Sequence, residues 1–202
     1  MCFRSGLAGS YYYGEQLTEE EADSIRFYFN YDMIGSPKPK YWVQASKPAD
    51  RVGGDILAAW LRKKGKTVEW EYVQPPHPNL ISHTYICHRE FGESSDYAAF
   101  IALGIPSSGI FTGADEETDP CYHLACDTID NVHWDALTLN TKTAGRAAAQ
   151  FALSLKGVPA RDKTSPNPKD KRAIAARFEH WQKKRTLAGN SHKCNHKTKE
   201  VV

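Results

Sequence analysis

The chain has 202 residues, of which 41% are hydrophobic and 25% are charged, and this composition suits one globular domain. Its formal net charge of +2 is too small to indicate a nucleic-acid partner, and its apolar runs are too short for a membrane span. The N-terminus lacks the apolar core and cleavage site of a signal peptide, so none is expected. Five cysteines are an odd number, which leaves at least one outside any intramolecular disulfide.

The first seventy residues predict two helical segments and three strands. Residues 6–23 read as the end of a helix followed by an acidic loop. The aromatic stretch 25–35 predicts a central strand, and residues 41–45 predict a short second one. Residues 50–66 carry apolar side chains at helical spacing and a basic last turn, which indicates a helix. Residues 68–73 alternate like a strand.

The middle of the chain begins with a long irregular loop, residues 75–93, which is rich in proline and histidine. A short helix follows, with Ser95 or Asp96 as its expected cap, and it leads into a core strand over residues 105–113. A last helix is expected to open at Asn131 or Asp135. The side chains expected on its buried side are Trp134, Leu137, Ala144, Ala148, Phe151 and Leu155.

This alternation of strands and helices argues for an α/β fold with a mostly parallel sheet. The composition changes near the end of the last helix. Residues 1–156 are therefore expected to form the domain. Residues 157–202 are expected to form a basic linker, an amphipathic helix over residues 173–184 and a polar tail.

Asp32 stands at the carboxyl end of the predicted central strand. In open α/β sheets reactive groups gather outside such ends, so Asp32 is a candidate site residue. A turn-forming aspartate explains the same position, and both interpretations stay open.

Cys121 and Cys126 bracket His123 in the stretch DPCYHLACDTIDN. A zinc knuckle needs paired C-x2-C elements and a redox pair favours C-x-x-C, and this stretch has neither. A local disulfide that closes a small loop fits the spacing better, and it would place the chain in an oxidising compartment. His123 itself is either a ligand, a surface histidine or a core histidine.

Other histidines and cysteines carry weaker signals. His83, Cys87 and His88 are expected in an exposed loop, because their spacing does not make them face one another. Cys194 lies in a polar tail, where it is either solvated or bonded to another cysteine. Asp96 is either a helix cap or a site carboxylate.

Four motifs occur in an order that resembles one known family: GLAGS, NYDMIGSP, SSDYAAFIALGIPSSGIFTGA and DPCYHLACDTIDN. Together they resemble the secreted two-zinc aminopeptidases of metallopeptidase family twenty-eight, most closely the fungal and bacterial leucine-type members, over residues 6–155. The resemblance implies a three-layer α/β/α sandwich and two zinc ions sharing the water that attacks the scissile bond. It also implies a peptide substrate with a free N-terminus, secretion and a monomer.

The resemblance implies a role for each matching residue. Asp32 and His123 match zinc ligands, and Tyr122 matches the tyrosine that stabilises the tetrahedral oxyanion. The Cys121–Cys126 pair matches a disulfide of the family. Asp127 lies where a carboxylate could orient His123.

Several positions of this sequence differ from the family pattern, and these differences are as informative as the matches. The first histidine ligand and the bridging aspartate would precede Met1, and the glutamate base and glutamate ligand are replaced by Phe3 and Arg4. Ser94 stands where the family has an arginine. The loop between Gly113 and Pro120 is also shorter than the Gly-rich loop that the family generally has there. Three of five ligands and the base are thus missing, so we expect an N-terminally truncated member, impaired in metal binding and nearly inactive.

Two further functions stay open from the sequence. A non-catalytic binding domain could keep the fold without the metals. A glutaminyl cyclase would use the same scaffold with a single zinc ion, although the Cys-Tyr-His arrangement favours the peptidase.

Overall fold

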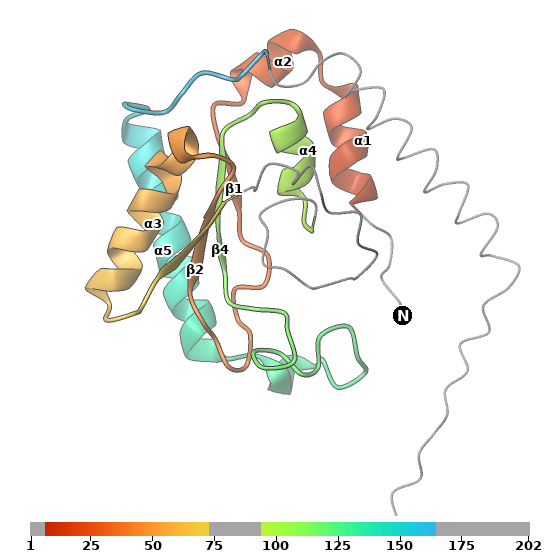
Figure 1. The fold of residues 1–202 in the computed structure, drawn as a ribbon, viewed down its shortest axis with the longest axis vertical. Helices are drawn as coiled ribbons and strands as arrows, with labels where there is room; N and C mark the ends of the chain where they lie inside the picture. Colours follow the sequence, from red (N-terminus) through yellow and green to blue (C-terminus); the bar gives the residue numbers. More distant parts are fainter. Residues whose placement is uncertain (1–6, 73–93, 165–202) are drawn as a thin grey trace, which may run out of the picture.

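The computed structural model describes residues 7–72 and 94–164 (Figure 1). Several expectations fall outside these ranges. They concern the irregular loop with its histidines and cysteine, the basic helix and tail, and the positions occupied by Phe3, Arg4 and Cys194.

The centre of the fold is a four-stranded sheet with strand order β1-β4-β2-β3. Its strands are β1 (Tyr28–Asn30), β2 (Trp42–Ala45), β3 (Glu69–Tyr72) and β4 (Ser107–Phe111). β1 pairs with β4 and β2 with β3 in parallel, whereas the central pair β2 and β4 is antiparallel. The chain passes from β1 to β2 through a loop without the crossover helix that a parallel return needs, so β2 runs the opposite way.

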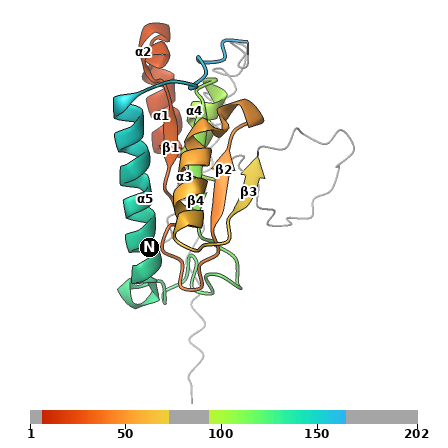
Figure 2. The same ribbon diagram turned by 90° about the vertical axis from the view of Figure 1, so that its left-hand side faces the viewer.

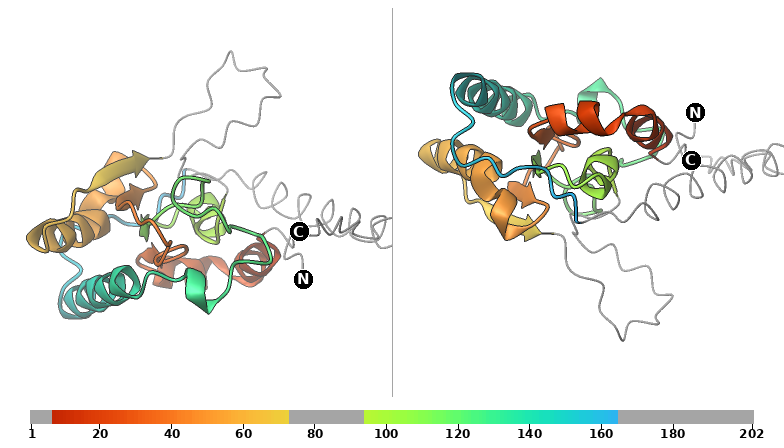
Figure 3. Two further views of the ribbon diagram at one scale, coloured as in Figure 1. Left: turned by 90° about the horizontal axis from the view of Figure 1, so that it is seen from below. Right: turned by 90° about the horizontal axis from the view of Figure 1, so that it is seen from above.

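Helices cover both faces of this sheet. α3 (Arg51–Lys63) and α5 (Trp134–Leu153) lie on one face, and α1 (Ala8–Gln16) and α4 (Tyr97–Ala102) lie on the other. Viewed from the ends, the strands separate the two helix layers (Figure 3). The expected three-layer α/β/α architecture is therefore confirmed. Among the described residues, no helix is both long and apolar enough to cross a bilayer.

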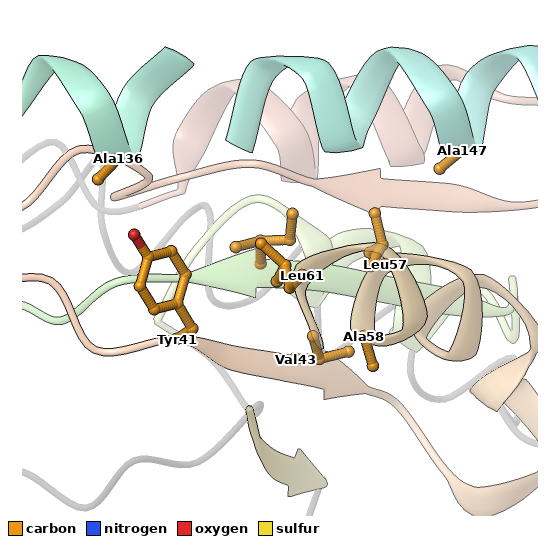
Figure 4. Close-up of a cluster of buried hydrophobic side chains, with 8 residues drawn as sticks. Tyr41, Val43, Leu57, Ala58, Leu61, Ala136 and Ala147 are labelled. Carbon is orange, nitrogen blue, oxygen red and sulfur yellow. The ribbon is translucent and has the colours of Figure 1, made fainter. Parts of the chain in front are cut away.

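The larger core cluster lies between the sheet and the layer formed by α3 and α5 (Figure 4). The helix expected over residues 50–66 is confirmed as α3, and Leu57, Ala58 and Leu61 point from it into the cluster. The residues whose spacing predicted the helix, Val52, Ile56, Ala59 and Trp60, are instead half-buried or exposed. The buried members of the cluster are Tyr41, Val43, Leu57, Ala58, Leu61, Ile110, Ala136 and Ala147.

The predicted buried side of α5 was wrong. Trp134 is 56% exposed, and the fully buried positions are Ala136, Asn140, Thr143 and Ala147. These small or polar side chains let α5 approach its neighbours closely, and Asn140 donates to the carbonyl oxygen of Ile34 at 2.8 Å. The prediction for α5 relied mainly on its large apolar residues, and these lie next to the buried face of the helix instead of on it.

The expected acidic loop after the first helix is a short helix, α2 (Glu19–Ser24). Thr18 and Glu21 form a reciprocal capping box at its start, with the Thr18 hydroxyl accepting from the Glu21 amide at 3.2 Å. Local capping thus makes a helix of a stretch whose charges suggested a loop.

The residues that follow α5 lie against α2 and α4 at the end of the molecule opposite the 119–131 loop (Figure 1). Arg161 donates to the carbonyl oxygen of Leu103 at 2.6 Å and forms ion pairs with Glu19 and Asp23. The Asp162 amide donates to Gly104, whose φ of 72° suits glycine. The expected domain boundary at residue 156 stays a prediction, and we propose that the domain continues to residue 164.

Gly109 in β4 provides a test of how closely the strands pack. A Cβ at this position would lie 2.7 Å from the Asn30 carbonyl oxygen and 3.2 Å from Gln44 Oε1. We expect Gly109→Ala to lower the free energy of unfolding by about 1–3 kcal/mol, measured by urea denaturation. Gly145→Ala is the matched control, because nothing lies within 4 Å of its Cβ position in α5. It should raise the stability by about 1 kcal/mol, and equal effects of the two changes would contradict the packing argument.

Candidate functional site

The candidate site lies at the edge of the sheet where β1 and β4 both end. Because these strands are parallel, their carboxyl ends meet there, and Asp32 follows β1 by two residues. Asp32 lines a hollow of about 440 Å³. The other residues around it are Leu7, Tyr28, Asn30, Tyr31, Ser94, Ser95 and Asp96.

Ser95 holds the carboxylate of Asp32. Its hydroxyl donates to Asp32 Oδ2 at 2.7 Å and lies 3.5 Å from Asn30 Oδ1. The sequence assigned Ser95 or Asp96 to the cap of α4. Asp96 occupies the cap position, in agreement with the second alternative, although its side chain makes no capping hydrogen bond. The Ser95 hydroxyl is directed to Asp32 instead.

Two tyrosines at this edge remain protonated near neutral pH. Burial, followed by the nearby charges of Asp96 and Asp32, raises the pKa of Tyr28. Burial alone raises the pKa of Tyr31 well above its usual range. The hydroxyl of Tyr28 donates to Asn30 Oδ1 at 3.5 Å, whereas the hydroxyl of Tyr31 is buried.

The loop that carries Asp32 is fixed by Thr112, the first residue after β4. The Met33 carbonyl oxygen accepts from the Thr112 amide at 2.8 Å and from its hydroxyl at 2.5 Å. The same hydroxyl accepts from the Ser36 amide at 3.1 Å. Met33 has a positive φ of 53°, so these bonds hold the backbone beside Asp32 in a rarely populated conformation.

The 119–131 loop presents Tyr122 and His123 together. A disulfide joins Cys121 and Cys126, whose Cα atoms are 5.4 Å apart. The rings of Tyr122 and His123 stack with their centroids 3.9 Å apart, and both side chains are exposed. The loop is closed at its base by Asp119, which accepts from the side-chain amide of Asn131 at 2.9 Å.

The two loops run side by side. The Lys38 amide donates to Thr118 and the His133 amide donates to Gly35, so the segments around Asp32 and His123 meet at one edge. Asp127 accepts from the Asn131 side chain at 3.1 Å, and the described structure records no hydrogen bond from Asp127 to His123. Its expected orienting role stays a prediction.

The described side chains of the candidate site do not form a zinc-binding set. A catalytic zinc needs at least three protein ligands. Within residues 7–72 and 94–164, no group of three or more histidine, cysteine, aspartate or glutamate side chains is placed to hold a metal ion. Asp32 and His123 alone do not fit a two-zinc centre.

Comparison with known sequences places these motifs in a family. Residues 5–148 match Peptidase family M28. Aminopeptidase Y of Saccharomyces cerevisiae is 34% identical over 165 residues, which cover 78% of this chain and 28% of the relative. Leucine aminopeptidase 2 of Arthroderma otae is 34% identical over 177 residues, with 79% and 34% covered. The chain thus spans about a third of the length of these relatives.

Solved structures support the same fold. An aminopeptidase from Aneurinibacillus sp. strain AM-1 superposes with a TM-score of 0.53 at 23% identity, covering 72% of this chain and 30% of that one. A zinc aminopeptidase from Bacillus subtilis gives a TM-score of 0.51 at 21% identity, with 78% and 36% covered. These similarities bear on the fold alone.

Replacing Thr112 tests how the Asp32 loop is held. Thr112→Val keeps the shape but leaves the buried Ser36 amide without its acceptor, so the free energy of unfolding should fall by about 1–3 kcal/mol. Hydrogen exchange at the Ser36 amide should become faster. Thr112→Ser should lose only the roughly 0.8 kcal/mol of one methyl group and keep the Ser36 amide protected. Unchanged exchange in Thr112→Val would contradict this assignment.

Proposed function

Because the chain belongs to Peptidase family M28, we propose that it is part of an aminopeptidase catalytic domain, which removes residues from the free N-terminus of peptides. The observation that carries the proposal is the family match over residues 5–148, which includes both site loops. Relatives named as aminopeptidases in two fungi support it.

In this proposal Asp32 and His123 are the two zinc-ligand positions that the chain supplies. Ser95 donates to one carboxylate oxygen of Asp32, which leaves the other oxygen directed elsewhere. Such a hydrogen bond restricts the rotation of a ligating carboxylate. The remaining ligands and the general base have no counterpart among the described residues, so this chain alone should hold zinc weakly.

Tyr122 is proposed to stabilise the oxyanion of the tetrahedral intermediate. A neutral phenol can donate a hydrogen bond to a developing negative charge, and 38% of Tyr122 is exposed to solvent. Its stacking against His123 holds the two groups together, so a substrate that reaches one also reaches the other.

The loop that carries both residues is proposed to depend on the Cys121–Cys126 disulfide. A disulfide in so short a loop is maintained in oxidising compartments, so we propose secretion, in agreement with the family resemblance. Thiol labelling of the secreted protein before and after reduction tests this, and freely reactive Cys121 and Cys126 before reduction would contradict it.

The chain as it stands should be nearly inactive. After incubation with zinc and desalting, elemental analysis should find well under one equivalent of metal, because two ligands hold zinc poorly. Hydrolysis of a chromogenic leucyl amide should stay at the level of the Asp32→Asn and His123→Ala variants. Stoichiometric zinc together with chelator-sensitive hydrolysis would show that the chain completes its own site. Stoichiometric zinc would also rule out the non-catalytic binding domain.

A graft tests whether the residues that are present can serve an aminopeptidase. Residues 5–148 would replace the matching segment of Aminopeptidase Y, whose remaining sequence then surrounds them. We expect hydrolysis of the leucyl amide, with a loss of at least about 100-fold in grafts carrying Tyr122→Phe or His123→Ala. Circular dichroism establishes that each graft is folded. A folded graft no more active than its His123→Ala variant would contradict the proposed roles.

A further inference from the structure

A second feature of the molecule lies on the outer side of α3 and α5, away from the hollow at Asp32. Six cationic side chains gather there, and we call them the basic ridge. They are Arg62, Lys63, Lys64, Lys66, Lys142 and Arg146. The first four lie at and just beyond the end of α3, and the last two are one turn apart on α5, which runs beside α3 (Figure 2).

The ridge lacks acidic partners within the part of the chain that the structure describes. None of its six side chains forms an ion pair with a described carboxylate. Cations elsewhere behave differently: Lys40 pairs with Glu117, and Lys47 pairs with Asp162. The small net charge of +2 therefore conceals a strongly one-sided distribution.

Three of the six cationic side chains in the ridge lie close to the indole ring of Trp60. Lys63, Lys64 and Arg146 lie 5.7, 4.9 and 4.8 Å from the ring centroid of Trp60. Each contact is attractive, but like charges gathered this closely repel one another. The indole nitrogen is buried, so the ring edge faces inward while the cations are held at the surface. The result is a fixed cluster of positive charge that a bound anion would stabilise.

One further net positive charge lies along the two helices, because Asp55 lines the next hollow together with Arg51 and Lys156 and neutralises Arg51. At the other end of α3 a hollow of about 870 Å³ lies between the two helices, with Arg51 and Lys156 in its lining. Arg51 pairs with Asp55, and Lys156 is exposed. The 13 residues of α3 separate the two ends by about 20 Å at 1.5 Å per residue. Such a track suits an extended ligand with repeated negative charges better than a single small anion.

The surface chemistry narrows the class of ligand. A membrane-binding surface would need exposed large apolar side chains beside its cations, and those that α5 exposes, Trp134 and Leu153, lie at its two ends, about two turns from Lys142 and Arg146. A single-stranded nucleic acid would use an open aromatic face for stacking, and the cations already occupy the Trp60 face. An acidic polysaccharide needs neither feature, because sulfate and carboxylate groups bind through charge alone.

We propose that the basic ridge and the groove beside it bind a linear anionic polysaccharide. The site shares no residue with the hollow at Asp32 or with the Tyr122 loop, so it is independent of the proposed peptidase function. Binding of the polysaccharide there would attach the protein to an acidic polymer and leave the candidate site at the sheet edge open.

Titration of the full chain with a heparin dodecasaccharide tests the proposal. The variant with Lys63→Gln, Lys64→Gln and Arg146→Gln should bind about tenfold more weakly, because it removes three of the six ridge charges and each exposed ion pair contributes little by itself. The matched control carries Lys183→Gln, Lys184→Gln and Arg185→Gln, with the same change in charge outside the described residues. It should keep most of the affinity. Urea denaturation should find the ridge variant as stable as the parent chain.

Three results would overturn the proposal. The first is an affinity lost in the control variant and kept in the ridge variant. The second is equal affinity for a heparin disaccharide, which is too short to span the track. The third is tighter, ridge-dependent binding to anionic phospholipid vesicles or to a single-stranded oligothymidine, which would assign the ridge to a membrane or to nucleic acid.

Discussion

The buried hydroxyl of Thr112 joins the two halves of the candidate site. It bonds to Met33 and Ser36, and the Ser36 contact spans 76 residues of sequence. Because Thr112 directly follows β4, the position of Asp32 is set by the sheet itself. The loop that leads on to Tyr122 and His123 starts from the same residue. The geometry of the edge therefore depends on this contact more than on either loop's own sequence.

Sequence patterns predicted the elements whose burial depends on large apolar side chains. Examples are β2 and β4, whose residues Val43 and Ile110 enter the core, and the helix α3, whose existence was expected although its buried residues, such as Leu57, were not the ones that predicted it. The pattern failed for α5, because its closest contacts are made by Ala136, Asn140 and Ala147. Size and hydrophobicity do not identify a face that packs through small side chains and a hydrogen bond to a distant carbonyl.

The candidate site shows the same limit. Asp32 could be found from its place after a strand, and Tyr122 and His123 from their motif. The use of the Ser95 hydroxyl could not, because a serine before a helix is usually a cap, and only the tertiary fold brings it to Asp32, 63 residues away. Family membership and a complete set of ligands are also separate questions. The fold and motifs are present here, whereas no group of three or more metal-ligating side chains gathers among the described residues.

The strand order also affects how this chain is made. β1 is an edge strand, and its described pairing is with β4, which is synthesised long after it. At 5–20 residues per second, the 76 residues between Ser36 and Thr112 take roughly 4–15 s to emerge from a ribosome. During that interval the aromatic strand β1, with the sequence Tyr-Phe-Asn, cannot yet pair with β4. Such a segment is a natural substrate for chaperones, so the yield of folded protein should be sensitive to translation speed between these two strands.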